Sequence, residues 1–526
     1  MSRPEPAENS LRASEVTGDG APVPGAPCES SAARAAAQAH PERPIPMNPR
    51  FEEAWRVAGD AALAHFREVG SLPVLPTAGD EELRERIQGI LAPGKAPALP
   101  NLTQEVAALL RDGAVQVTSP RYFGLFNPST LEPSIVADAL VALYNPQLAA
   151  RSHAPAAAEM ERASLGFFAR YLGMEGDNFH ATFTSGGAEA NLSAVLAALA
   201  HRYPRHGHRG LRGLRRRPAI YVSGESHHSF TKIARMTGLG TQALKEIPTT
   251  PDLTLDPEGL RKRVLSDRRA GWDPLLVVGT AGTTGAGVVD PLDEIGRVAG
   301  SEDLWFHVDA AWGGAALLSP RLREAFTGIE VADSVTWDAH KWLSVPMGAG
   351  MFFARHPEAV RKAFSVSTSY MPESQEGGGD EAYLTTAQWS RRAIGVKVFM
   401  CLAHLGADGY RRLIEHQAEM GDELRSLLRG AGWDVLNRTP LPVVCFSHAD
   451  IRTGGLSIQR LLAELYRKGE VWISEVVLGG KEPALRACIT SYRTEPDDLR
   501  SLVKEVERAR KAGGFPRVRS RSPVEP

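Results

Sequence analysis

The chain has 526 residues, and its 60 Lys and Arg against 62 Asp and Glu exclude a global field that would attract nucleic acid or an anionic membrane. Four cysteines without a CxxC pair are typical of a reducing cytoplasm and argue against a disulfide scaffold. The N-terminus lacks the apolar stretch of a secretory signal, and the longest uncharged run, residues 274–289, is too short to span a membrane.

The first part of the chain is expected to be a tail followed by a helical arm. Residues 1–48 are rich in Pro, Ala, Glu and Ser, and they cannot bury enough apolar surface to offset their ordering entropy. We therefore expect them to be disordered. Residues 49–130 open with a helical pattern in which Phe51, Trp55 and Phe66 share one face, and a second helix is expected after Asp80.

Residues 131–400 alternate short apolar runs with helical patterns, which predicts a large α/β domain. Strands are expected at 181–184, 219–222, 275–279, 304–308 and 333–336. Runs of this kind, bounded by Gly or Asp, indicate a parallel sheet covered on both faces. The Arg-rich run at 205–217 has no interleaved aromatic residues, so it predicts a solvated loop rather than a nucleic-acid patch.

Residues 401–512 predict a smaller C-terminal α+β domain, followed by a tail at 513–526. An amphipathic helix is expected at 408–429, with Gly430 as its C-cap. Strand-like runs follow at 443–447 and 486–491, and a last helix is expected to begin at Asp497 or Asp498.

Two charged residues follow predicted strands at the sheet edge where ligands gather in open α/β folds. Lys341 lies between Trp337 and Trp342, and partial burial would make its neutral amine accessible for a Schiff base. A solvated surface lysine is the alternative. Asp309 ends an apolar strand, where an acid is costly unless it is paired. It could hold a proton on a pyridine nitrogen, or it could cap a helix.

Other residues supply what an aldehyde cofactor with a phosphate tail requires. The segment TSGGAEAN (184–191) joins a strand to a helix through two glycines, and such a turn offers free N–H groups to a phosphate. His228 could stack over a planar ring, although His227 competes for that role and a buried, hydrogen-bonded histidine is the alternative. The combination favours pyridoxal 5'-phosphate, with no metal ion.

Five motifs in order, TSGGAEAN, HHSF, TAGTTGAG, HVDAAWGG and DAHKW, resemble the group II pyridoxal-phosphate-dependent amino-acid decarboxylases. This family includes the aromatic-amino-acid, histidine, glutamate and cysteine-sulfinate decarboxylases. The resemblance covers about residues 50–512. It implies a fold type I enzyme with a mostly parallel seven-stranded sheet in the large domain. It also implies a homodimer with its active sites at the interface.

The resemblance assigns roles to individual residues. It implies that Lys341 bonds to the cofactor, that Asp309 pairs with the ring nitrogen and that His228 stacks on the ring. Phosphate and ring contacts are implied for Gly187, Ala188, His340, Thr280 and Ala311.

A loop tyrosine that returns a proton to the substrate is implied at Tyr383, with Tyr370 as the other candidate tyrosine and the glycines at 377–379 as a hinge. His228 is the alternative catalytic residue for this proton transfer. The sequence departs from animal aromatic decarboxylases at Asp338, Ala339 and Trp312. These positions lie beside the cofactor, so the substrate of those enzymes does not transfer to this chain.

The expected reaction is decarboxylation of an L-amino acid to its amine and carbon dioxide. Tyr122, Phe123 and Trp312 favour an aromatic or bulky apolar substrate, and acidic amino acids remain open. A decarboxylation-dependent aldehyde synthase or a carbon–carbon lyase on the same fold is the nearest alternative. An aminotransferase fits the motifs less well. A non-catalytic binding protein with a decayed site would be expected to lack Lys341 or Asp309.

Overall fold

The computed structural model describes residues 48–94, 96–176, 178–367 and 381–513. The predicted tails and the Gly-rich hinge at 377–379 therefore fall almost entirely outside the described residues. Within these ranges, no helix combines the length and the apolar character needed to cross a bilayer.

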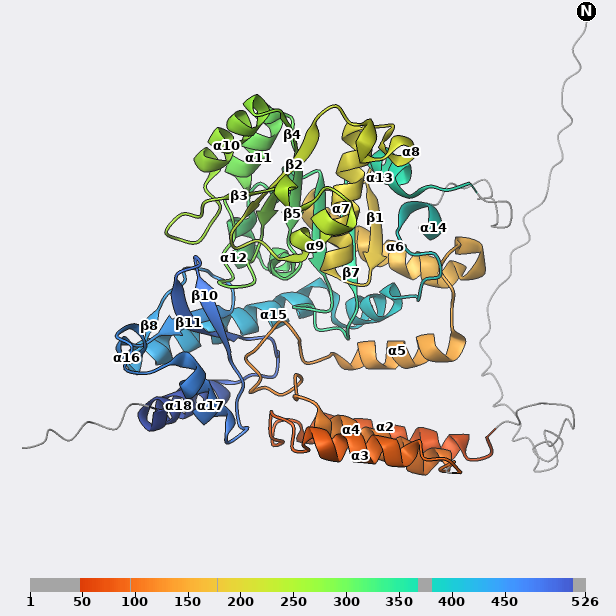
Figure 1. Ribbon diagram of the computed structural model, residues 1–526. Coiled ribbons are helices and arrows are strands. Elements are labelled where there is room, and N and C mark those ends of the chain that lie inside the picture. The colour runs from red at the N-terminus through yellow and green to blue at the C-terminus, as the bar shows by residue number, and fades with distance from the viewer. Residues whose placement is uncertain (1–47, 95, 177, 368–380, 514–526) are drawn as a thin grey trace, which may run out of the picture.

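A seven-stranded sheet forms the centre of the molecule (Figure 1). Six strands run in one direction, and only β7 is antiparallel to its neighbours β1 and β6. The strand order is β1-β7-β6-β5-β4-β2-β3. The bounds are β1 (His180–Thr184), β2 (Arg217–Ser223), β3 (Leu244–Ile247), β4 (Trp272–Thr280), β5 (Trp305–Asp309), β6 (Ser334–Asp338) and β7 (Gly350–Ala354).

The five predicted strands are all present, and the mostly parallel α/β sheet is confirmed. The sequence patterns did not reveal β3 and β7. β3 has only four residues and lies at the sheet edge, where Glu246 is exposed and interrupts the apolar pattern. β7 is a short apolar run, which a sequence alone does not distinguish from buried helix or loop.

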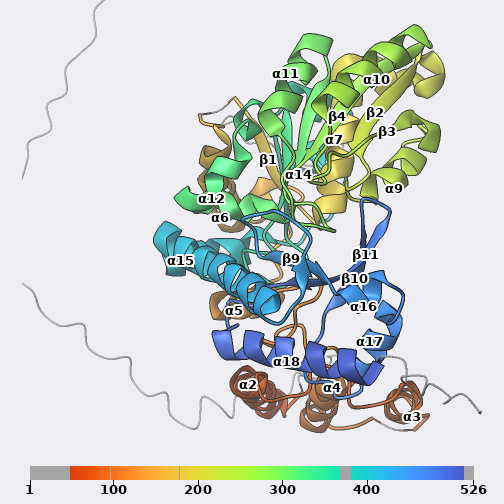
Figure 2. The same ribbon diagram turned by 90° about the vertical axis from the view of Figure 1, so that its left-hand side faces the viewer.

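Helices cover both faces of this sheet (Figure 2). One face packs against α7 (Gly187–Arg202), α9 (Ser229–Met236) and α13 (Pro357–Phe364). The other packs against α6 (Pro155–Ala169), α10 (Pro257–Arg269) and α11 (Leu292–Glu302). In β4, Leu276 and Val278 face the first layer and Val277 faces the second. This double burial explains why the central strands are continuously apolar.

The C-terminal part contains a four-stranded antiparallel sheet with the order β10-β11-β9-β8. Its strands are β8 (Asp434–Val435), β9 (Val443–Ser447), β10 (Ser474–Leu478) and β11 (Glu482–Cys488). The helices are α16 (Ala449–Arg452), α17 (Ile458–Tyr466) and α18 (Pro496–Gly513). The predicted strand at 486–491 ends at Cys488, and the last helix begins one residue before the first of the two predicted starts.

A long helix, α15 (Gly395–Gly430), connects the two parts and crosses the boundary predicted at residue 400. The predicted helix at 408–429 is correct at its C-terminal end but begins earlier. Gly406 has φ 62°, so the helix is interrupted there. This interruption explains why the amphipathic pattern becomes regular only after it.

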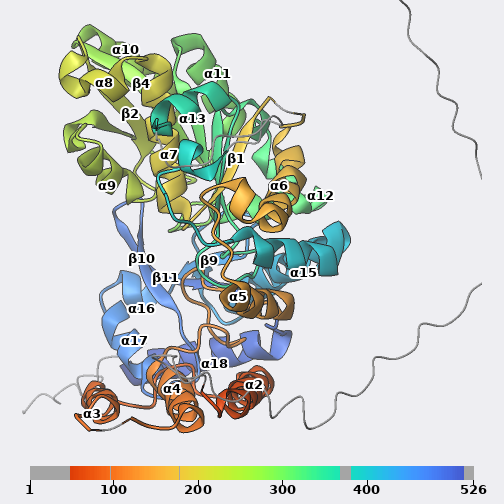
Figure 3. The ribbon, with the colours of Figure 1, turned by 90° about the vertical axis from the view of Figure 1, so that its right-hand side faces the viewer.

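The arm contains α2 (Phe51–Glu68), α3 (Asp80–Ile90) and α4 (Leu99–Gly113), with α5 (Glu132–Tyr144) beside them (Figures 1 and 3). Large apolar side chains point to solvent from these helices: Trp55 is 58% exposed, Leu143 69% and Tyr144 77%. Exposed apolar surface spread over several helices is typical of a surface that binds another protein.

Candidate active site

A cavity of about 300 Å³ opens at the carboxyl ends of β4, β5 and β6. Every residue expected to bind the cofactor lines it except His228. The lining residues are Phe126, Ser185, Gly186, Gly187, Ala188, Glu189, Asn191, His227, Thr280, Gly282, Thr284, Asp309, Ala311, Trp312, Asp338, His340, Lys341 and Met347.

Lys341 reaches the cavity from the turn that follows β6. Its Nζ lies 3.1 Å from Oδ2 of Asp338, which is the last residue of that strand. The other carboxylate oxygen of Asp338 is buried and has no hydrogen-bond partner within the described residues. The Lys341 side chain is 21% exposed. Asp338 therefore orients a lysine amine that can still be approached from the cavity.

Asp309 ends β5, and its carboxylate is held by two donors. Asn191 Nδ2 donates to Oδ2 at 2.9 Å, and the Ala311 backbone N–H donates to Oδ1 at 3.1 Å. Asp309 is 5% exposed. The carboxylate is thus fixed beside the cavity, in a position to accept a hydrogen bond from a protonated ring nitrogen.

A buried chain of hydrogen bonds lies behind Asp309, and no sequence motif indicated it. Trp305 Nε1 lies 2.8 Å from Ser334 Oγ, which lies 2.8 Å from His307 Nδ1. His307 Nε2 lies 3.0 Å from Asn191 Oδ1. With the proton of His307 on Nε2, every bond donates toward Asp309. This arrangement requires a neutral His307, and burial lowers its pKa to about 4.

His307 therefore makes the folded protein sensitive to acid. Below about pH 6.5 the unfolded chain takes up the proton, whereas the folded chain does so only near the lowered pKa of about 4. Stability contributed by the neutral ring is complete above pH 6.5 and is lost as pH falls toward 4, by roughly 3 kcal/mol in total.

We expect the free energy of unfolding of His307→Gln to fall less steeply than that of the wild type between about pH 7 and about pH 4.5. The measurement is urea unfolding with saturating cofactor at each pH. The control is His404→Gln, at an exposed position of α15. Parallel pH profiles for wild type and His307→Gln would show that His307 does not carry this proton linkage.

The glycine turn before α7 forms a cradle that only small residues allow. A Cβ at Gly187 would lie 2.9 Å from Asp338 Oδ2, and a Cβ at Gly186 would lie 3.2 Å from His340 Cε1. The N-terminus of α7 supplies free N–H groups and a positive helix dipole at this point. His340 Nδ1 accepts from the Ala349 backbone N–H at 2.9 Å, which leaves Nε2 to donate. The cradle suits a phosphate group.

The structure places His227, rather than His228, in the wall of the cavity. Burial lowers the pKa of His227, and the charges of Asp309 and Lys341 also act on it. His227 Nδ1 accepts from the Ser229 backbone N–H at 3.2 Å, and this bond orients the ring. His228 is the N-cap residue of α9 and lies near Glu225 instead.

An aromatic stack contributes Phe126 and Trp312 to the wall of the cavity, with Trp342 buried next to them. Phe126 stacks on Trp312 with ring centroids 4.7 Å apart, and Trp312 stacks on Trp342 at 4.9 Å. Lys341 Nζ lies 5.6 Å from the Phe126 ring centroid. Tyr122 and Phe123, which were expected in the substrate pocket, are buried beside the C-terminal sheet, where Tyr122 stacks on Trp472.

Arg486 reaches this wall from β11, far along the sequence. Its guanidinium lies 4.8 Å from the Phe126 ring centroid, and its Nε and Nη1 donate to the carbonyls of Thr284 and Gly124 at 2.9 and 2.7 Å. Nη2 is buried and has no partner within the described residues. No motif in the sequence marked this residue, since a single arginine in a predicted strand carries no signal.

Tyr383, expected to supply a proton, lies in α14 (Ala382–Thr385). Its side chain is buried, with its ring 5.6 Å from that of Trp389, and its backbone N–H donates to Ala149. It is not among the residues that line the cavity of its own subunit. Tyr370 lies outside the described residues.

These features define the class of protein. A fold type I sheet, a lysine amine, a carboxylate and a phosphate cradle at one sheet edge together fit pyridoxal phosphate. The close approach at Gly187 and the unpaired oxygen of Asp338 are further observations that fit a bound group. The pyridoxal-dependent decarboxylase conserved domain matches residues 83–449, and the chain belongs to this family. It is a pyridoxal-phosphate-dependent amino-acid decarboxylase.

Relatives with different substrates are about equally similar to the chain. An L-aspartate decarboxylase of Metarhizium robertsii is 28% identical over 401 residues, 75% of this chain and 78% of that protein. Tryptophan decarboxylase 1 of Oryza sativa subsp. japonica is 27% identical over 470 residues, 84% of this chain and 90% of that protein. The structure of Oryza sativa TDC with PLP and tryptamine has a TM-score of 0.83 at 25% identity and covers 90% of this chain and 100% of that one.

Proposed function

We propose that this decarboxylase acts on an L-amino acid with an aromatic or bulky apolar side chain and releases the amine and carbon dioxide. The observation that carries the proposal is the pair of stacked rings, Phe126 and Trp312, that line the cavity beside Lys341 and are backed by Trp342. Such a wall gains free energy by covering an apolar side chain, and stacked rings add to that gain. The tryptophan decarboxylase of Oryza sativa supports the same choice.

An acidic substrate is the second candidate, and Arg486 is the observation that favours it. The buried Nη2 of this residue, which has no partner within the described residues, would pair with a carboxylate, and such a charge-assisted bond is strong in a cavity sheltered from water. The aspartate decarboxylase of Metarhizium robertsii supports this alternative. Arg486 could equally hold the α-carboxylate of any amino acid, so it does not by itself select the side chain.

Each residue of the cavity has a separate role in binding the cofactor or orienting another residue. When bound, pyridoxal phosphate supplies a conjugated ring that accepts the electron pair left by the departing carboxylate. Lys341 supplies the amine that attaches to the cofactor aldehyde, and Asp338 orients it. Asp309 holds a proton on the ring nitrogen, and Asn191 holds Asp309. We assign ring stacking to His227 in place of His228, because His227 lies in the cavity wall.

Phosphate contacts are proposed for Gly187, Ala188 and His340, and ring contacts for Thr280 and Ala311, since all five line the cavity. The orientation of the substrate decides which bond breaks. We therefore propose that Phe126 and Trp312, which line the cavity, orient the substrate, and that Arg486, which contacts Phe126 and Thr284 but does not itself line the cavity, contributes through its free Nη2.

The function is tested by supplying a panel of L-amino acids while carbon dioxide, amine and hydrogen peroxide are measured. We expect the protein to release carbon dioxide and amine without peroxide. The rate is expected to be highest with tryptophan, tyrosine or phenylalanine. Preference for aspartate or glutamate would overturn the substrate proposal. Peroxide with an aldehyde product would show the aldehyde-synthase alternative on the same fold.

Replacing Arg486 separates its two roles. We expect Arg486→Lys to raise KM for the best substrate by about 10- to 100-fold, because lysine has no donor in the place of the free Nη2. An effect on every substrate in the panel would show that Arg486 binds the α-carboxylate. An effect confined to aspartate and glutamate would show a side-chain contact. The control is Arg438→Lys, whose side chain is 87% exposed; an unchanged KM for Arg486→Lys would exclude both roles.

We propose Tyr383 as the residue that returns a proton to the substrate, with Tyr370 as its rival. Because Tyr383 does not line its own cavity, its action requires either movement of its segment or a neighbouring subunit. Tyr383→Phe and Tyr370→Phe form a matched pair for this test. The variant that loses amine formation while still releasing carbon dioxide identifies the proton donor.

We further propose a cytoplasmic homodimer with its active sites at the interface. Exposed apolar side chains on α2, α4 and α5 support a protein-binding face, and the buried free thiols of Cys401, Cys445 and Cys488 fit a reducing compartment. Sedimentation equilibrium is expected to give twice the mass of the chain. Leu143→Asp with Tyr144→Asp should give monomers; a wild-type monomer would refute the proposal.

A further inference from the structure

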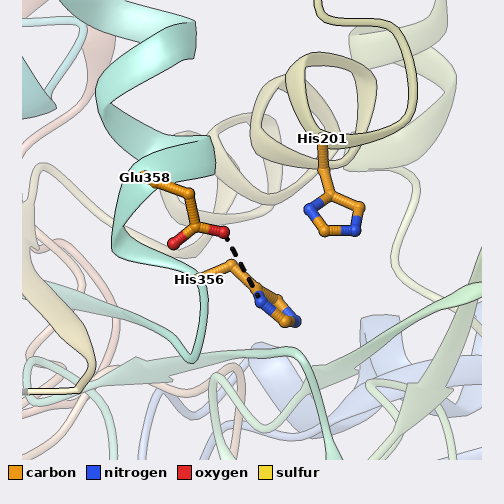
Figure 4. Close-up of side chains that lie close together, drawn as sticks. All are labelled: His201, His356 and Glu358. Atoms are coloured by element: carbon orange, nitrogen blue, oxygen red, sulfur yellow. Dashed lines mark ion pairs between the residues drawn. The ribbon is translucent and has the colours of Figure 1, made fainter.

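Three side chains that bind metals in many proteins converge at the edge of the sheet opposite the cavity. His201 lies in the last turn of α7, His356 directly precedes α13, and Glu358 lies in the first turn of α13. One ligand atom from each lies within 4.8 Å of the others. Figure 4 shows the two rings and the carboxylate turned toward a common space.

This cluster is separate from the active site. α7 begins at the phosphate cradle with Gly187 and ends at Arg202, next to His201. Its 16 residues extend roughly 24 Å at 1.5 Å per residue. Likewise, Trp305 at the start of β5 packs beside His201 and His356, whereas Asp309 at the end of β5 lines the cavity.

A carboxylate orients the His356 ring, and a tryptophan ring packs beside both histidines. His356 Nε2 lies 2.9 Å from Asp333 Oδ1, so that Nδ1 faces Glu358 Oε1 at 3.8 Å. Asp333 is itself fixed, because its Oδ2 accepts from the Phe306 backbone N–H at 2.7 Å. Pairing of one imidazole nitrogen with a carboxylate is the arrangement that orients metal-binding histidines. The Trp305 ring lies 5.5 Å from His201 and 5.2 Å from His356.

We propose that His201, His356 and Glu358 bind a divalent transition-metal ion of the zinc class. Two imidazole nitrogens and one carboxylate oxygen are ligands that zinc prefers, and a fourth position would remain for water. Tetrahedral zinc brings its ligand atoms to about 3.3 Å from one another, closer than the 4.8 Å found here. The exposed side chains of His201 and Glu358 can rotate to close that gap.

The bound ion would join the C-terminal end of α7 to the start of α13. These two helices pack on the same face of the sheet. The ion would therefore act as a clamp within the large domain and would not take part in the reaction. The inference does not depend on the substrate proposed above.

The test is titration of the cofactor-loaded protein with zinc chloride by calorimetry. We expect the wild type to bind one zinc ion per chain. We expect the zinc affinity of both His201→Ala and Glu358→Gln to be lower by at least about 10-fold. The control is the double variant His206→Ala/His208→Ala, which removes the histidines of the neighbouring short helix α8 (His206–Arg209). It should keep the site, and zinc should raise the Tm of wild type and control but not of the two test variants.

Decarboxylase activity serves as the check on folding, and it should be unchanged in the test variants without added zinc. Zinc affinity equal to wild type in active His201→Ala or Glu358→Gln would overturn the proposal. Loss of the site in the His206→Ala/His208→Ala control would also overturn it, because the ion would then bind the histidines of α8. A wild-type protein that binds no zinc would contradict the proposal directly.

Discussion

Lys341→Ala is expected to lose at least about 10³- to 10⁴-fold in kcat/KM and to fail to trap the cofactor on treatment with borohydride. The reason is geometric as well as chemical. Nζ of Lys341 enters the cavity beside the phosphate cradle and is held by Asp338. Without that amine, the cofactor has no covalent attachment to the protein. The proton transfers at the cofactor also lose the group that acts as their acid and base. The measurements are visible absorbance, borohydride labelling and release of carbon dioxide.

Two variants make that result specific. Lys341→Arg keeps a positive charge beside Asp338 but cannot form the bond, so it should be as inactive as the alanine variant. Lys232→Ala, at an exposed position of α9, should retain both colour and activity. A borohydride-sensitive, active Lys341→Ala protein would contradict the assignment of the lysine.

Arg391→Met is expected to lower the free energy of unfolding by about 3–5 kcal/mol, because it leaves a buried carboxylate unpaired. Arg391 and Glu161 are both buried and share a hydrogen-bonded ion pair. Arg391 Nη1 also donates to the Phe183 carbonyl of β1 at 3.0 Å, and Glu161 accepts from the Gly395 backbone N–H at 3.0 Å. The pair thus joins β1, α6 and the start of α15. Burial raises the pKa of Glu161, which shows how costly its charge is.

The neighbouring residue provides a matched control for urea unfolding. Arg392 pairs with Asp138 but its side chain is 56% exposed, so Arg392→Met should cost less than about 1 kcal/mol. The double variant Glu161→Met/Arg391→Met should recover much of the loss, since it removes both buried charges. If Arg391→Met and Arg392→Met lowered the free energy of unfolding equally, burial would not determine the strength of the ion pair between Arg391 and Glu161.

The sequence predicted those parts of the fold where the pattern is local. The continuous apolar run at 275–279 is recognisable as a strand buried on both faces, and β4 contains it. Strand ends also place side chains: Asp309 is the last residue of β5 and Lys341 lies in the turn after β6. Because these strands are parallel neighbours, the two side chains meet at the same edge of the sheet. β3 was missed because the exposed Glu246 interrupts its apolar pattern, and β7 because a short apolar run does not by itself distinguish a strand from buried helix or loop.

The parts of the site that could not be predicted depend on contacts between distant segments. Asn191 is a polar residue inside α7, and only the packing of that helix on the sheet shows that it joins Asp309 to His307. The choice between His227 and His228 depends on the turn before α9, where neighbouring side chains point in different directions. Arg486 gave no signal, because its role depends on the C-terminal sheet reaching Phe126.

The bond between Arg486 and the Gly124 carbonyl joins residues 362 positions apart and has a consequence for biosynthesis. At 5–20 residues per second, a ribosome needs roughly 20 to 70 s to pass from one to the other. From the synthesis of Trp342 until that of Arg486, the wall beside Phe126 has its aromatic residues but lacks its arginine. The nascent chain therefore exposes the apolar surface of an incomplete pocket. The cofactor can bind in its final geometry only after translation, when almost the whole polypeptide is present.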